Sequence, residues 1–163
     1  FQAHAIQKEY KAFVWGWFKD GDKKGVISAP IGRSKSDFRQ YSADRFARGE
    51  LREAVTEYEV LDEFETKAFP KVSITPRFAY VSVKPKTGRT HQIRVHMKHI
   101  HHVIVADSLY APAHPKALGF KRQALHAEKI MFVDMKGKTR IFEAPLPEDF
   151  AQAIDTHVGK GVV

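Results

Sequence analysis

The chain has 163 residues, of which 43% are hydrophobic and 28% charged, and this composition suits one globular domain with its own core. It contains no cysteine, which excludes disulfides, thiolate zinc sites and a cysteine nucleophile. No run of residues approaches the roughly 20 apolar positions that span a bilayer. Because no apolar run is long enough, we expect no membrane role. No signal or transit pattern stands at the start.

The positive charge is concentrated in two stretches of the chain, whose formal net charge is +8. Residues 84–122 hold eight lysines and arginines against one acid, Asp107, a net of +7. Residues 33–52 hold six more, diluted by three acids. Clustering of this kind favours a surface that binds phosphates of a polyanion.

Four strands are expected in the first half of the chain. Branched and aromatic residues predict strands over residues 8–18, 25–29, 52–64 and 77–84, and the third of these alternates between apolar and polar positions. Residues 31–50 are polar and basic, so we expect a loop or an irregular excursion there.

A helix is expected after the fourth strand. Pro85 and Gly88 break the strand pattern, and apolar residues from Ile93 onward recur at helical spacing. We expect the helix over roughly residues 90–100, with Thr90 as its cap.

The last third of the chain predicts a short buried strand, a loop, a hairpin and a final helix. The strand is expected at residues 102–106, the loop at 111–119, the hairpin strands at 122–134 and 138–144, and the helix from Pro147.

Strands dominate this pattern and no βαβ rhythm is present, so the fold class is α+β. We expect a mainly antiparallel or mixed sheet with a few flanking helices. One domain is predicted over residues 1–157, followed by a frayed tail at 158–163.

Seven of the nine histidines lie between His91 and His126, which makes a metal hydrolase one interpretation of the chain. They lack the H-E-x-x-H pattern of a zinc-binding helix, and no thiolate is available. We therefore expect no metal, and instead histidines that are hydrogen-bonded or that meet phosphates when protonated. Elemental analysis for zinc separates the two interpretations.

The run TGRTHQIRVH at residues 87–96 resembles the signature of the RluA-type RNA pseudouridine synthases. Other pieces resemble the family in the same order: K-x-Y-x-A-x-V-x-G from Lys8 to Gly16, G-x-I-x-x-P-I-x-R from Gly25 to Arg33, R-E-A-V-T at 52–56, D-x-x-Y at 107–110, R-x-x-L-H-A at 122–127 and A-P-L-P at 144–147. The resemblance covers almost the whole chain and implies the fold of that family's catalytic domain.

Members of this family isomerise uridine to pseudouridine in ribosomal and transfer RNA, so the resemblance implies RNA as the partner. An aspartate attacks a flipped-out uridine, and the base detaches, rotates and is rejoined through carbon, with no cofactor or metal. Extruding the nucleotide costs a few kcal/mol, and a basic surface must hold the RNA backbone meanwhile.

The resemblance implies two catalytic residues and one pocket residue. Arg94 matches the arginine that pairs with the catalytic aspartate and keeps it ionised. Tyr10 matches the tyrosine beside the target base, where a ring can stack and a hydroxyl can take part in proton transfer. Leu125 matches an apolar residue of the uridine pocket. The alternatives are a helix-surface ion pair for Arg94 and core packing for the other two.

Further substrate-binding residues are expected where the predicted helix begins. Gly88, Arg89 and Thr90 could offer backbone N–H groups to a phosphate. His91 and Gln92 are candidates by position. Asp107 matches a family residue that looks structural rather than nucleophilic.

The family's nucleophile lies in an H-R-L-D motif a few tens of residues before K-x-Y, and that motif does not occur in this sequence. We expect the aspartate upstream, with residues 1–5 ending the intervening helix, and we expect this chain alone to be inactive. Missing strands would expose a sheet edge and permit a dimer. The alternative is a non-catalytic RNA-binding module of the same fold, and the resemblance also implies a cytoplasmic location.

Overall fold

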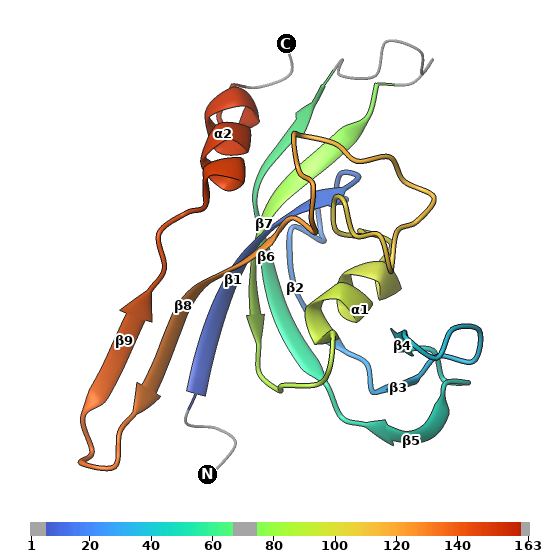
Figure 1. The fold of residues 1–163 in the computed structure, drawn as a ribbon, viewed down its shortest axis with the longest axis vertical. Coiled ribbons are helices and arrows are strands. Elements are labelled where there is room, and N and C mark those ends of the chain that lie inside the picture. Colours follow the sequence, from blue (N-terminus) through green and yellow to red (C-terminus); the bar gives the residue numbers. More distant parts are fainter. Residues whose placement is uncertain (1–5, 67–74, 161–163) are drawn as a thin grey trace.

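The computed structural model describes residues 6–66 and 75–160, which form two antiparallel sheets and two helices (Figure 1). The larger sheet has six strands in the order β2-β6-β7-β1-β8-β9, and the smaller has three in the order β4-β3-β5. The elements are β1 (Ile6–Trp15), β2 (Lys24–Ser28), β3 (Ile31–Arg33), β4 (Tyr41–Ser42), β5 (Arg48–Arg52), β6 (Val55–Glu65), β7 (Arg77–Pro85), α1 (Gln92–His99), β8 (Leu125–Val133), β9 (Thr139–Glu143) and α2 (Glu148–His157). The α+β prediction is confirmed.

The core lies on both faces of β1 and β7, the central strands of the larger sheet. Successive side chains of a strand face opposite sides, so each face needs its own cover. Thr56 of β6 is hydrogen-bonded to side chains of α1 on one face. Phe13 packs on Phe150 of α2 on the other, with ring centroids 5.6 Å apart. The two helices therefore cover opposite faces of one sheet.

The predicted strand at residues 102–106 is wrong. This segment forms only an isolated bridge between Ile104 and Val14 of β1. His101 and Ala106 at its two ends both have positive φ angles, 66° and 57°. Left-handed residues turn the backbone, so the apolar run is buried beside β1 without extending as a strand.

The predicted loop at residues 31–50 is also wrong, because this segment carries β3, β4 and most of β5. The strands have three, two and five residues, and every residue of β5 is exposed. Strands of two or three residues are too short to show apolar alternation, and an exposed strand such as β5 has no buried face to produce it, so the usual sequence signal is absent.

The helix α1 begins at Gln92, and Thr90 is not its cap. The N-cap is His91, which has a left-handed φ of 55° and makes no capping bond with its side chain. Instead, the amide oxygen of Gln92 accepts hydrogen bonds from the Arg89 N–H and the Thr87 hydroxyl, at 2.9 and 2.7 Å. The side chain of the first helical residue thus stabilises the start of α1.

The predicted C-terminal hairpin and final helix are confirmed. Strands β8 and β9 meet at a turn in which Asp134 accepts the N–H groups of Lys136 and Lys138, and Gly137 supplies a φ of 74°. The helix α2 follows Pro147.

The predicted domain boundary at residue 157 stays a prediction. Val158 packs against the core, and the Gly159 N–H donates to Asp62 at 2.7 Å. Residues 1–5, expected to end a helix, and 161–163 of the expected tail lie outside the described residues. Within the described ranges, no helix is long and apolar enough to cross a membrane.

Candidate functional site

A pocket of about 400 Å³ opens between β1 and the N-terminal end of α1. Seven of the eight site residues predicted from the sequence line it: Tyr10, Gly88, Arg89, His91, Gln92, Arg94 and Leu125. Thr90 does not line it and is exposed beside it. Segments more than 110 residues apart, at β1 and the start of β8, therefore converge on one cavity.

Arg94 is fixed on the wall of this pocket by Asp107. The guanidinium donates from Nε and Nη2 to the two carboxylate oxygens, at 2.7 and 2.6 Å. The Asp107 side chain is fully buried, whereas that of Arg94 is 14% exposed. Asp107 also accepts the N–H groups of Leu109 and Tyr110, which fixes the carboxylate. A buried bidentate pair of this geometry orients an arginine strongly.

The pKa of Asp107 shows that its hydrogen bonds and the charge of Arg94 together outweigh its burial. Burial alone would raise this pKa. The hydrogen bonds from Arg94 and from the Tyr110 and Leu109 N–H groups, with the Arg94 charge, hold it below its usual value. The pair is therefore ionised at neutral pH.

An aromatic cluster supports the same arginine. The Arg94 guanidinium lies 4.7 Å from the centroid of the Tyr110 ring. The Tyr110 hydroxyl accepts the Tyr41 N–H at 3.0 Å and lies 2.9 Å from Nδ1 of His91. Burial, together with the Arg94 charge, lowers the pKa of His91, so this imidazole is neutral at pH 7.

Arg94 thus offers the pocket only part of its hydrogen-bonding capacity. A guanidinium has five N–H groups, and the two toward Asp107 occupy one edge. The Nη1 edge remains for a group in the cavity. Arg94 is not the surface ion pair considered from the sequence, because its described partner is a buried carboxylate.

Tyr10 lines the same pocket from β1, a central strand of the larger sheet. It pairs with Val83 of β7 on one side and Ala127 of β8 on the other. The pairing with β8 shifts register between Glu9 and Tyr10, so Glu128 is the additional residue of a β-bulge. Bulges re-aim side chains and are common beside functional sites.

Lys8 is a pocket residue that the sequence analysis missed. It lines the cavity, and its Nζ lies 3.7 Å from the position that a Cβ on Gly88 would take. No carboxylate pairs with it among the described residues. The spacing K-x-Y was the available signal, because residues two apart on a strand share a face.

Gln92 is a pocket-lining residue whose amide is occupied by the protein. Its oxygen accepts from Arg89 and Thr87, and its nitrogen donates to the Val55 carbonyl and the Thr56 hydroxyl, both at 2.9 Å. This amide joins the β7–α1 connection to β6. Its predicted contact with substrate stays a prediction, and the geometry gives it a positioning role.

Arg89 and Gly88 form the outer lip of the pocket. Nε of Arg89 donates to the Glu53 carbonyl at 2.9 Å, and this bond does not use the two Nη groups. Gly88 is exposed, and a Cβ there would meet only the Lys8 ammonium. Two cations thus flank an open glycine backbone, an arrangement that suits a phosphate.

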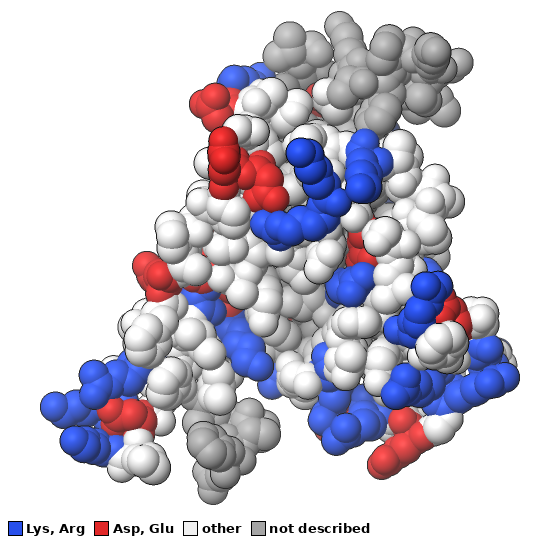
Figure 2. Space-filling view, in the orientation of Figure 1, with Lys and Arg blue, Asp and Glu red and all other residues white. Residues whose placement is uncertain are grey.

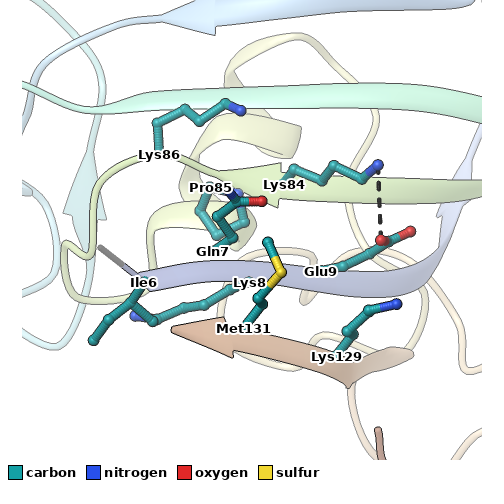
Figure 3. Close-up of a pocket in the computed structure, with 9 residues that line it drawn as sticks. All are labelled: Ile6, Gln7, Lys8, Glu9, Lys84, Pro85, Lys86, Lys129 and Met131. Atoms are coloured by element: carbon teal, nitrogen blue, oxygen red, sulfur yellow. Dashed lines mark ion pairs between the residues drawn. The ribbon is translucent and has the colours of Figure 1, made fainter. Parts of the chain in front are cut away.

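A second hollow of about 300 Å³ lies where β1 adjoins β7 and β8 (Figure 3). Its lysines are mostly paired with acids: Lys84 with Glu9 at 3.7 Å, Lys86 with Glu57 at 2.8 Å, and Lys129 with Glu143 at 2.6 Å. The pairing leaves this hollow less suited to an anion than the pocket at Arg94. No group of three histidines or acids that could hold a metal occurs among the described residues.

The fold and pocket together define an α+β domain that presents a fixed arginine, a tyrosine and further cations in one cavity. Comparison with known proteins identifies its family. The chain matches the family model described as RNA pseudouridylate synthase over residues 1–99, and it belongs to that family.

Individual relatives agree. The chain is 38% identical over 151 residues to the uncharacterized RNA pseudouridine synthase YlyB of Bacillus subtilis, covering 92% of this chain and 44% of that protein. It is 33% identical over 147 residues to tRNA pseudouridine synthase C of Haemophilus ducreyi, covering 86% and 58%. The solved structure of human RNA pseudouridylate synthase domain containing 1 matches with a TM-score of 0.72 and 25% identity, covering 93% and 60%. The chain thus spans about half the length of the curated relatives it matches.

Proposed function

We propose that this protein isomerises uridine to pseudouridine in ribosomal or transfer RNA, with the target uridine in the pocket between β1 and α1. The observation that carries the proposal is the convergence of Tyr10 and the fixed Arg94 on one cavity. In this reaction the N1–C1′ bond breaks, the base rotates and a C5–C1′ bond forms. The hydrogen of C5 leaves to solvent, and N1 gains a proton.

Arg94 has the role of holding a carboxylate nucleophile. Its Nη1 edge points away from Asp107 and can donate to a second carboxylate. A neighbouring guanidinium keeps such a carboxylate ionised in a pocket poor in water. No H-R-L-D sequence occurs in these 163 residues, so we propose that the nucleophile comes from outside them.

The other pocket residues bind and position the nucleotide. Tyr10 stacks on the uracil ring, and its hydroxyl takes part in proton transfer with the base. Lys8 and Arg89 hold the phosphates on either side of the extruded nucleotide. Leu125 packs against the base edge from the start of β8.

A non-catalytic RNA-binding module is the second candidate. The observation in its favour is that Arg94 already has a carboxylate partner inside this chain, Asp107. An arginine so neutralised could remain stable with no nucleophile beside it. A cytoplasmic location and a dimer through an open edge, β2 or β9, are further proposals.

Tritium release from 5-tritiated uridine in ribosomal and transfer RNA transcripts tests the proposal. We expect release by the complete gene product, and a loss of about 100-fold or more in Arg94→Ala, because an electrostatic contact to the reacting groups is removed. Arg140→Ala, on the distant hairpin, is the matched control and should release tritium normally.

The same assays on the 163-residue chain alone distinguish the two candidate functions. We expect it to bind the transcripts in a salt-sensitive way without releasing tritium. Release by this chain alone would show that the nucleophile lies within it, contrary to the proposal. Absence of release by the complete gene product would favour the binding module.

A further inference from the structure

Residues 31–52, which carry β3, β4 and β5, project from the larger sheet beside α1 (Figure 1), and we call them the β3–β5 module. Two phenylalanines of this module are strongly exposed, Phe38 at 81% and Phe46 at 56%. Single exposed apolar residues are common in folded proteins. These two are distinguished by the way they are held and by the charges around them.

Both phenylalanines are presented by ordered turns. The Phe46 N–H donates to Asp44 at 2.8 Å, which closes a turn formed by an aspartate side chain. Asp37 closes a similar turn with the Arg39 N–H at 2.9 Å. The Arg33 guanidinium also donates to the Phe38 carbonyl at 3.1 Å. The backbone that displays the two rings is therefore fixed.

The module is rich in cations that lack acidic partners. Of its six lysines and arginines, Arg39 alone forms an ion pair with a carboxylate among the described residues. Figure 2 shows Lys and Arg side chains gathered over this part of the molecule. The Arg45 guanidinium lies 4.5 Å from the Phe46 ring centroid, so a planar cation covers a planar ring. Arg33 lies similarly over Tyr41, at 4.9 Å.

The module is tied to the loop that fixes Arg94. The Gln40 side chain donates to the Leu109 carbonyl at 2.9 Å, and the Tyr41 N–H donates to the Tyr110 hydroxyl at 3.0 Å. A fixed attachment of this kind sets the distance between the exposed rings and the pocket.

A groove of about 630 Å³ runs between the module and the second half of α1. Arg45, Lys98 and His99 line it together with several serines, and Asp44 is its one acid among the described residues. Tyr41, another lining residue, makes an edge contact with His91 of the Arg94 pocket, with ring centroids 6.1 Å apart. The groove and the pocket are thus neighbours, separated by an aromatic wall.

We propose that this groove and the two phenylalanines bind unpaired nucleotides that flank the target uridine. Arg45 and Lys98 hold phosphates, the open Phe38 ring stacks on one base, and the Arg45–Phe46 pair stacks on another. Interleaved cations and aromatic rings beside a polar groove match single-stranded RNA better than a protein surface. The proposal rests on the proposed function, because it extends the same RNA beyond its uridine.

Binding of a fluorescent oligouridylate of about twelve nucleotides to the 163-residue chain tests the proposal, since single-strand sites span a few to over a dozen nucleotides. We expect Phe38→Ala to weaken binding by about fivefold or more, as loss of one stacked base does. The slope of log affinity against log salt should stay unchanged, because no phosphate contact is lost. Arg45→Ala should reduce that slope by about one.

Control variants lie at the turn of the β8–β9 hairpin, at one edge of the larger sheet. Met135 is fully exposed there, and Met135→Ala should bind as the parent chain does. Lys138→Ala should leave the salt slope unchanged. Circular dichroism confirms that each variant is folded.

The outcomes separate this proposal from the proposed function. Parent binding with no loss in Phe38→Ala and Phe46→Ala, or an equal loss in Met135→Ala, would overturn the proposed binding at the groove and leave the proposed uridine pocket unaffected. Such a result would favour a protein partner for the module. No binding of RNA by the parent chain would overturn the groove proposal alone, because the isomerisation is tested separately by tritium release from the complete gene product. Ultraviolet cross-links from 5-iodouridine to Phe38 or Phe46 would support the stacking directly.

Discussion

Replacing Asp107 by asparagine should destabilise the protein far more than the loss of an ordinary ion pair. The fully buried carboxylate accepts four hydrogen bonds, two from Arg94 and two from backbone N–H groups. Asparagine can keep the backbone bonds, but its NH₂ group would face the guanidinium, leaving a largely buried charge without a partner.

The magnitude follows from the burial of the pair. Breaking a buried ion pair costs about 3–5 kcal/mol. Because Arg94 is 14% exposed, water can recover part of the loss, and we expect about 3 kcal/mol. For a chain of this size that lowers Tm by roughly 6–12 °C.

Urea and thermal unfolding followed by circular dichroism measure the effect. Asp149→Asn is the matched control, because Asp149 pairs with Arg122 at 3.1 Å at the surface and should cost under about 1 kcal/mol. Adding Arg94→Met to Asp107→Asn should recover stability, since the unpaired charge is removed. The reasoning fails if Asp107→Asn costs no more than Asp149→Asn, or if the double variant is the less stable.

Further predictions concern pH and the interior. The pKa of Asp107 is lower in the folded protein than its ordinary value of 3.8, so its contribution to stability is complete above pH 3.8 and is lost as pH falls through the pKa of the folded state. The stability of Asp107→Asn, measured by unfolding across this pH range, should lack this acid-dependent loss. Burial lowers the pKa of His96, which is fully buried and bonded to Thr56, so the unfolded chain protonates first and stability should fall as pH drops below 6.5. A stability that is constant from pH 7 to about 5 would contradict this. Gln92→Leu should cost about 1–3 kcal/mol in urea unfolding, because four groups each lose one hydrogen bond, and Gln152→Leu, at an exposed position of α2, serves as its control.

The central part of the fold was predictable because its sequence signals are local. Strand β7 is apolar on both faces and six of its nine residues in succession are buried, so the pattern is unmistakable. The turn at Asp134 and Gly137 likewise follows from residues that favour it. By contrast, β3–β5 depends on contacts with α1 and with the loop at Tyr110, which no local pattern reveals.

The residues that line the pocket were largely predictable from the sequence, but the contacts between them were not. The pairing of Arg94 with a nucleophile, which the resemblance implies, stays a prediction, and the partner of Arg94 in the structure, Asp107, lies 13 residues later in the chain. That contact requires the backbone to return after α1, which it does through the left-handed residues His101 and Ala106. The hydrogen bonds of Gln92 also join three segments and could not be read from spacing.

Tyr110 has a consequence that extends beyond packing. Its ring lies against Arg94, which lines the pocket, and its hydroxyl accepts the N–H of Tyr41, which lines the groove, so one buried side chain contacts a lining residue of each cavity. Any ligand that changes the position or stiffness of Tyr110 from one side changes the free energy of binding on the other. Thermodynamic linkage requires that this influence be equal in both directions. Measuring how one ligand alters the affinity for the other therefore gives the coupling between the cavities, whichever is filled first.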